Sequence, residues 1–219
     1  FLSKATGRSL ADIATEVILG RSLKEQGILE IYPKERDRWY VKVPVFSFSK
    51  LTGADASLSP EMKSTGEAIG YDDKLNRALY KALQASGMKL HNYGAVLVTV
   101  CDRDKAEALP LIRRFYNLGF NIEATAGTAV FLKENGIRTR KLNKISEGSS
   151  DIPNALRQGH IAYVINTSDV SGTAEDTDGY RIRSIATENN ITMFTSLDTA
   201  RVLLDVLEET TLCVSTIDA

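Results

Sequence analysis

The spacing of hydrophobic and polar positions changes partway along this chain of 219 residues. The first part predicts isolated elements separated by turns: helices over Ser9–Gly20, Ser22–Glu25 and Asp72–Ser86, and a strand over Trp39–Phe48. Pro44 indicates an edge position or a bulge in that strand, because proline cannot donate a ladder hydrogen bond. Lys50–Gly66 is rich in turn-forming residues, so we expect a loop there.

From Gly94 onward, short apolar runs alternate with amphipathic segments. The runs predict strands over Ala95–Val100, Phe120–Glu123, Thr139–Leu142, His160–Asn166 and Ile191–Thr195. The segments between and after them predict helices over Lys105–Leu118, Val130–Glu134, Pro153–Gln158, Arg183–Asn189 and Thr199–Glu208. This alternation predicts an α/β fold in which one parallel sheet has helices on both faces. Cys213–Ile217 is a candidate for a further edge strand. A linker near Ala85–Gly94 divides the chain into domains 1–88 and 89–219.

Composition narrows the classes of function. The net charge of −1 favours neither nucleic acid nor an acidic membrane surface as a partner. The longest apolar runs, such as Ala95–Cys101, are too short to cross a bilayer. Cys101 and Cys213 lack metal-ligand spacing and indicate reduced thiols, so a cytoplasmic location is expected. The chain begins without methionine at Phe1, which we interpret as a piece of a longer polypeptide.

The sequence Thr125-Ala126-Gly127-Thr128 lies where a predicted strand meets a predicted helix. The first N–H groups of a helix lack internal partners and carry partial positive charge. Glycine lets an anion approach the backbone, and threonine hydroxyls donate hydrogen bonds. The pattern therefore supports a phosphate-binding turn. The alternative is that Thr125 or Thr128 only caps the helix.

Other polar residues follow the remaining strands, and in a parallel sheet these carboxyl ends share one edge. They are Thr99, Lys105, Asn143, Lys144, Asn166, Thr167, Ser168, Thr195 and Ser196. Together they indicate a pocket for a phosphorylated sugar or nucleotide. The alternative for each lysine is a solvated surface charge.

Groups suited to catalysis are few at this edge. His91 falls in the linker and His160 opens a strand, so neither is placed as a general base. Asp151 is interpreted first as a helix N-cap and second as an acidic residue of the site. Asp178-Gly179 is typical of a turn. No histidine, cysteine and carboxylate cluster has metal spacing.

Two stretches resemble a known family. Ser3–Arg8 and Leu58–Glu67, the latter containing Pro-Glu-Met-Lys-Ser-Thr-Gly-Glu, are similar to the end of the second ATP-grasp unit of the carbamoyl-phosphate synthetase large subunit. From Gly94 the chain resembles the methylglyoxal-synthase-like regulatory domain of the same subunit, with Thr125–Thr128, Asn143–Lys144 and Asn166–Thr167 matching its pattern. The resemblance implies a partial α+β ATP-grasp fragment followed by that regulatory domain.

The family makes carbamoyl phosphate from bicarbonate, glutamine-derived ammonia and ATP, for arginine and pyrimidine synthesis. The resemblance implies that the full-length subunit is an ATP-dependent ligase using ATP, Mg and K, whose sites belong to segments that precede Phe1. For this fragment it implies no catalytic residue and no cofactor of its own. The implied partners are the remainder of the large subunit, the small glutaminase subunit, further copies in an oligomer, and a phosphorylated effector such as UMP or IMP.

The resemblance also assigns an effector site. Its implied residues are Thr99, Lys105, Thr125, Gly127, Thr128, Lys144, Asn166, Thr167, Ser168 and Thr195. Ornithine-responsive members carry an acidic residue and a tyrosine at the positions of Val43 and Met193. An ornithine ammonium group would find no carboxylate here, so a nucleotide-type effector is expected instead.

Two other functions remain open from the sequence. A methylglyoxal synthase-type lyase acting on a triose phosphate needs a carboxylate base. Those enzymes have an aspartate at the position of Asn166, whose amide cannot accept the proton, although Asp151 lies near their other acidic position. The third possibility is a domain that serves only subunit assembly.

Overall fold

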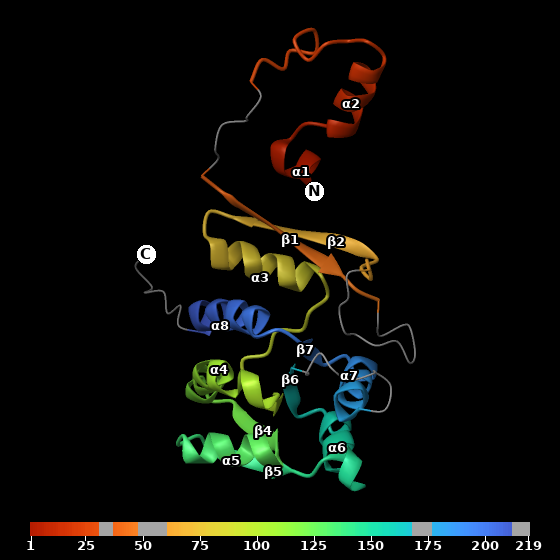
Figure 1. Ribbon diagram of the computed structural model, residues 1–219. Coiled ribbons are helices and arrows are strands. Elements are labelled where there is room, and N and C mark those ends of the chain that lie inside the picture. Colours follow the sequence, from red (N-terminus) through yellow and green to blue (C-terminus); the bar gives the residue numbers. More distant parts are fainter. Residues whose placement is uncertain (31–36, 48–60, 168–176, 212–219) are drawn as a thin grey trace, which may run out of the picture. The chain divides into compact units, whose positions relative to one another are not determined.

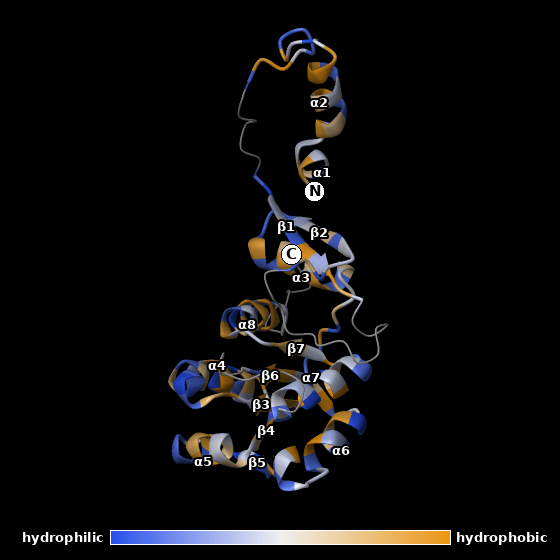
Figure 2. Ribbon diagram, turned by 45° about the vertical axis from the view of Figure 1, so that its right-hand side comes forward, coloured by the Kyte–Doolittle hydropathy of each residue, from blue (hydrophilic) through white to orange (hydrophobic). Residues whose placement is uncertain are grey.

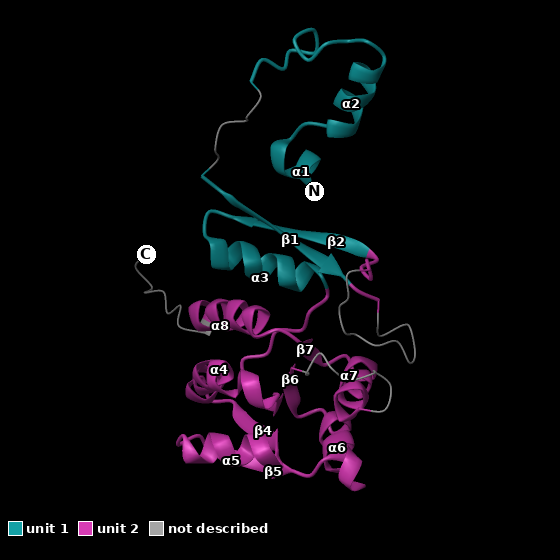
Figure 3. Cartoon of the chain, in the orientation of Figure 1, with its two compact units in different colours: residues 1–45, 66–86 teal, residues 46–65, 87–219 magenta. Residues whose placement is uncertain are grey.

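The computed structural model describes residues 1–30, 37–47, 61–167 and 177–211 (Figure 1). The chain divides into two compact units, residues 1–45 with 66–86 and residues 46–65 with 87–219 (Figure 3). Ser168, the candidate strand Cys213–Ile217 and most of the expected loop Lys50–Gly66 lie outside the described residues. Within the described residues, no helix is both long enough and apolar enough to span a bilayer.

The first unit combines a strand pair with three helices. Its elements are α1 (Leu2–Thr6), α2 (Leu10–Ile18), β1 (Trp39–Val45), β2 (Gly66–Asp72) and α3 (Leu75–Ala85). β1 and β2 are antiparallel and form a two-stranded sheet, with Pro44 opposite Glu67, so the edge position expected for Pro44 is confirmed. The sequence pattern did not predict β2, because its two glycines, Gly66 and Gly70, weaken the strand signal.

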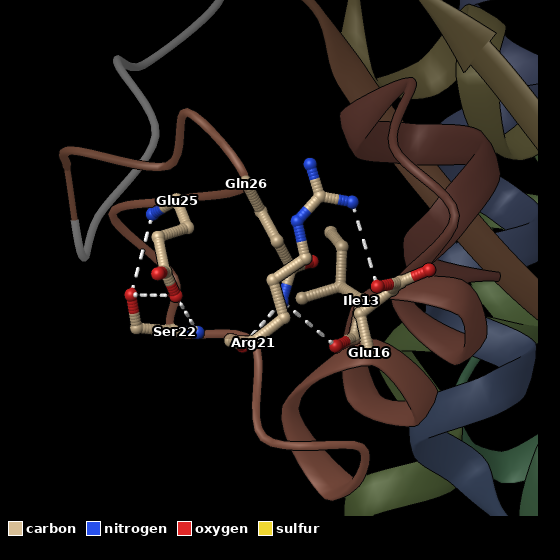
Figure 4. Close-up of polar contacts among 6 residues, drawn as sticks. All are labelled: Ile13, Glu16, Arg21, Ser22, Glu25 and Gln26. Carbon is tan, nitrogen blue, oxygen red and sulfur yellow. Dashed lines mark hydrogen bonds and ion pairs between the residues drawn. The ribbon is translucent and has the colours of Figure 1, made fainter.

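The predicted short helix over Ser22–Glu25 is wrong; this segment forms a hydrogen-bonded turn (Figure 4). The Glu25 carboxylate accepts hydrogen bonds from the backbone N–H of Ser22 at 2.7 Å and from its hydroxyl at 2.8 Å. The Gln26 side chain donates to the carbonyls of Arg21 at 3.1 Å and Ile13 at 3.4 Å. These local side-chain hydrogen bonds to the backbone compete with the backbone hydrogen bonds of a helix, so the segment forms a turn.

The second unit contains a five-stranded sheet in which all strands are parallel. The strands are β3 (Ala95–Thr99), β4 (Asn121–Thr125), β5 (Thr139–Leu142), β6 (Ile161–Asn166) and β7 (Thr192–Phe194). Their order is β5-β4-β3-β6-β7. The chain adds β4 and then β5 on one side of β3, and then adds β6 and β7 on the other side of β3. The direction of building therefore reverses between β3 and β6, which is where ligands bind in such sheets.

Helices cover both faces of this sheet, as predicted (Figure 1). One face carries α4 (Lys105–Asn117), α5 (Ala126–Glu134) and α8 (Leu197–Thr211), and the other carries α6 (Asp151–Arg157) and α7 (Asp178–Glu188). All positions of β3 and β6 are buried, and the strands at the centre of the unit are coloured as hydrophobic in Figure 2. The turn expected at Asp178-Gly179 is wrong, because these residues form the first turn of α7.

An ion-pair cluster joins α4 to α8 and gives stability a pH dependence. Arg114 donates to Glu208 at 2.8 Å and to Asp205 at 2.6 Å. The hydrogen bond from Arg114 lowers the pKa of Glu208. A lowered folded-state pKa gives stability that is present above the unfolded-state pKa, about 4.3, and is lost as pH falls through the folded value.

We therefore expect Glu208→Gln to be less stable than the wild type near neutral pH, by at most about 1 kcal/mol, and to lose less stability on acidification. Denaturant unfolding between about pH 6 and about pH 3 measures the difference. Glu188→Gln, at an exposed position of α7, is the control. Parallel pH curves for Glu208→Gln and the wild type would contradict the expectation.

Candidate functional site at the carboxyl ends of the strands

The centre of the site is a buried hydrogen-bond network where β3 and β6 lie side by side. Thr99 and Asn166 are register partners at the ends of these strands and are 8% and 3% exposed. The Asn166 side-chain amide donates to the Thr99 hydroxyl at 2.7 Å, and its carbonyl oxygen accepts from Arg183 at 3.1 Å. The network fixes the orientation of the Asn166 side chain. The group at this position is an amide and not a carboxylate.

Arg183 is a member of the site that the sequence analysis missed. It lies on α7, is only 6% exposed, and reaches the sheet between Ile182 and Ala186 of the same buried face. A side chain at Gly179 would approach the Arg183 guanidinium to 3.2 Å, so glycine leaves room for it in the first turn of α7. The predicted helix began at Arg183, whereas α7 begins at Asp178. Arg183 was therefore expected at a helix start and not on the buried face of the helix.

The amino end of α5 faces the same edge. Thr125 ends β4 and occupies the N-cap position, but its side chain makes no capping hydrogen bond, so the capping alternative is wrong for Thr125. Gly127 is exposed in the first turn, while Thr128 is 2% exposed and points its side chain inward. Uncapped N–H groups beside an exposed glycine are the local features of an anion site at a helix terminus.

Lys105 lies directly against this first turn of α5. Its ammonium group donates to the Gly127 carbonyl at 3.3 Å, and its side chain is 19% exposed. The same ammonium group is 2.7 Å from Asp102, whose side chain is 94% exposed. The hydrogen bond and charge of Lys105 lower the pKa of Asp102, and the charge of Lys144 adds to this effect. Both lysines therefore act on the position that the Asp102 carboxylate occupies.

A second cluster borders the network after β3. The Cys101 thiol donates to Asp104 at 3.0 Å, and the Thr167 hydroxyl accepts from the Cys101 N–H at 3.2 Å. The hydrogen bond from Cys101 is the main cause that lowers the pKa of Asp104, with a further contribution from Thr167. Cys101 is a free, half-buried thiol. Thr167 is thus engaged in positioning the chain after β3.

Asp151 is not an N-cap, as the first interpretation had it. Ser150 occupies that position, and Asp151 is the first residue of α6. Its carboxylate accepts from the Asn143 backbone at 3.1 Å and from the Asn143 side chain at 2.9 Å. Asp151 therefore holds the segment after β5 from which exposed Lys144 projects.

The structure brings together some of the expected site residues and leaves others apart. Thr99, Asn166 and Thr167 are joined through hydrogen bonds, and Lys105 joins Gly127. Thr195 follows β7 at the sheet edge and is half-buried, with β6 between its strand and β3. Across the described ranges, no three His, Cys, Asp or Glu side chains come together as ligands for a metal.

Part of this unit is similar to known proteins. The profile of the MGS-like domain matches residues 107–195. Similar solved structures include a methylglyoxal synthase from Elizabethkingia anophelis NUHP1, at 18% identity and a TM-score of 0.45 over 52% of this chain and 79% of that protein. Another is ForH, at 17% identity and a TM-score of 0.41 over 53% of this chain and 81% of that protein. The matched residues lie within the second unit, from the first turn of α4 to the residue after β7.

Proposed function

We propose that the second unit binds a phosphorylated effector of the nucleotide type and regulates a carbamoyl-phosphate synthetase, of whose large subunit this chain is the C-terminal part. In this proposal, residues 1–88 are the end of the carbamoyl-phosphate-forming ATP-grasp domain. The remainder of that subunit, the small glutaminase subunit and an oligomer are the proposed partners. The effector shifts the enzyme between states by binding one of them more tightly.

The observation that carries the proposal is the position of Lys105. Its ammonium group is held 3.3 Å from the Gly127 carbonyl, in the first turn of α5, where uncapped backbone N–H groups attract anions. Asp102 occupies the anion position beside it, and Lys144 adds positive charge. A phosphate group that displaced the Asp102 carboxylate would meet two ammonium groups and a helix amino end together.

The second candidate is a methylglyoxal synthase-type lyase acting on a triose phosphate, which the MGS-like match supports equally. That reaction needs a carboxylate to remove a proton. Asn166 is an amide bonded to Thr99 and Arg183, and Asp151 already accepts two hydrogen bonds from Asn143. Asp104 has a lowered pKa, which weakens it as a base. These features favour binding without turnover.

The test is calorimetric titration of the chain with UMP, IMP and phosphoribosyl pyrophosphate. We expect at least one to bind, and Lys144→Ala to weaken it by about tenfold to a hundredfold, because a charged contact with phosphate is lost. Asp102→Asn should tighten binding by up to about fivefold, since it removes an exposed competing carboxylate. Lys133→Ala, at the exposed far end of α5, is the matched control.

Two results would contradict the proposal. Absence of binding by all three ligands would leave assembly as the role of the unit. Sustained formation of methylglyoxal from dihydroxyacetone phosphate would instead support the lyase. Lys133→Ala separates site-specific binding from nonspecific attraction, because a loss of affinity equal to that of Lys144→Ala would show that only the overall charge matters.

A further inference from the structure

A hollow lies at the amino ends of the strands, at the sheet edge opposite the carboxyl-end site. Its volume is about 590 Å³. We call it the amino-end hollow; its polar lining includes Tyr116, Asn121, Glu123, Arg138, Arg140 and His160. The strands are about five residues long, so roughly 15 Å separates the amino-end and carboxyl-end edges of the sheet. The hollow shares no lining residue with the site at the carboxyl-end edge.

Glu123 is the most unusual residue of this hollow. It is 4% exposed, although it lies on β4 among apolar neighbours. Its Oε1 atom is 3.2 Å from the Arg140 guanidinium and 3.1 Å from His160 Nε2. Its Oε2 atom is buried and accepts no hydrogen bond from any described residue. Buried acceptors without a donor are uncommon in folded proteins, so this atom indicates a missing donor.

Two guanidinium groups supply the complementary feature. Arg138 is exposed, and no described residue forms a hydrogen bond or ion pair with its side chain. The Arg140 side chain is 66% exposed and uses one nitrogen atom for Glu123, which leaves the rest of its planar donor group for an anion. Guanidinium groups bind carboxylates in a bidentate manner. The hollow thus offers one buried acceptor and two anion-binding donors.

We propose that the amino-end hollow binds a small carboxylate that also carries a hydrogen-bond donor, as hydroxy acids and amino acids do. The carboxylate lies against Arg138 and Arg140, and the hydroxyl or ammonium group donates to Glu123 Oε2. A phosphate dianion fits less well. The negative charge of Glu123 offsets part of the positive charge of the two arginines, so the net positive charge that remains in the hollow is small. The proposal does not depend on the nucleotide site.

The test is NMR titration of the whole chain with glycolate, glycine, acetate and ethylammonium. Glycolate or glycine should bind, and the comparison of the two identifies the preferred donor. Acetate lacks the donor and ethylammonium lacks the anion, so each should bind at least about tenfold more weakly. Shifts should concentrate at Glu123, Arg140 and His160.

Variants complete the test. Arg138→Gln is an exposed change that should keep the fold and weaken binding by about tenfold or more, whereas Arg157→Gln, an exposed change on α6, should leave it unchanged. Glu123→Gln should reduce the preference for glycine over acetate. If no probe binds, if acetate binds as well as glycolate and glycine, or if Arg138→Gln has no effect, the proposal is wrong and water satisfies Oε2. Lys144→Ala should not change this binding, so failure here is distinct from failure of the nucleotide site.

Discussion

Replacement of Gly70 by alanine is expected to destabilise the first unit by about 3 kcal/mol or more, the upper range for overpacking. Gly70 lies on β2 where the strand passes directly under α3. A methyl group there would overlap the Ala78 carbonyl and the Ala82 backbone nitrogen, and would lie 2.8 Å from the Ala82 side chain. Backbone atoms cannot move aside as a flexible side chain does, so α3 must separate from the strands.

The measurement is chemical denaturation followed by a probe in the first unit, such as the fluorescence of Trp39, the single tryptophan of the chain. Gly66→Ala is the matched control on the same strand, because its methyl group would meet only Val45 at an ordinary 3.8 Å. Equal unfolding midpoints for the two variants would show that the close approach of β2 and α3 is not a constraint.

Tyr163→Phe is expected to lower the free energy of unfolding of the second unit by about 1–3 kcal/mol. The fully buried Tyr163 hydroxyl accepts from the His91 N–H at 2.6 Å and donates to the His91 carbonyl at 2.9 Å. Burial raises the pKa of Tyr163 to about 12, so the hydroxyl keeps its proton at neutral pH. Phenylalanine fills the same space but leaves both backbone groups without this partner.

Denaturant unfolding measures the loss, and hydrogen exchange at His91 reports whether the segment before β3 is released. Tyr116→Phe on α4 is the control, since that ring is 37% exposed. Slow exchange at His91 in Tyr163→Phe, together with wild-type stability, would show that another contact holds this segment to the sheet. The Thr192 hydroxyl, which donates to the Lys89 carbonyl at 3.0 Å, is the first candidate.

The alternation of apolar and amphipathic segments was enough to predict the parallel sheet. β3 and β6 are buried along their whole length, and such strands read as continuous apolar runs. The carboxyl-end residues Thr99 and Asn166 could also be placed together, because parallel strands end at one edge. Their hydrogen bond follows from this arrangement.

What the sequence did not indicate depends on contacts between distant segments. Arg183 was read as the start of a helix, because nothing local shows that its guanidinium bonds to an amide 17 positions earlier. Glu123 was read as the end of an apolar strand, although Arg140 and His160, from two other parts of the chain, make its burial possible. The turn at Ser22–Glu25 escaped detection for a different reason, since its side-chain bonds oppose a local helix pattern.

The ion pair between Lys105 and Asp102 affects which anions can bind beside Lys105, according to the charge that they carry. An arriving ion must exchange places with an anion already 2.7 Å from the ammonium group. Chloride or acetate, with a single negative charge, gains little from this exchange. If the proposed effector binds here, we expect its phosphate monoester, which carries more charge and more acceptor oxygens, to displace the exposed Asp102 carboxylate more readily than these monovalent ions do.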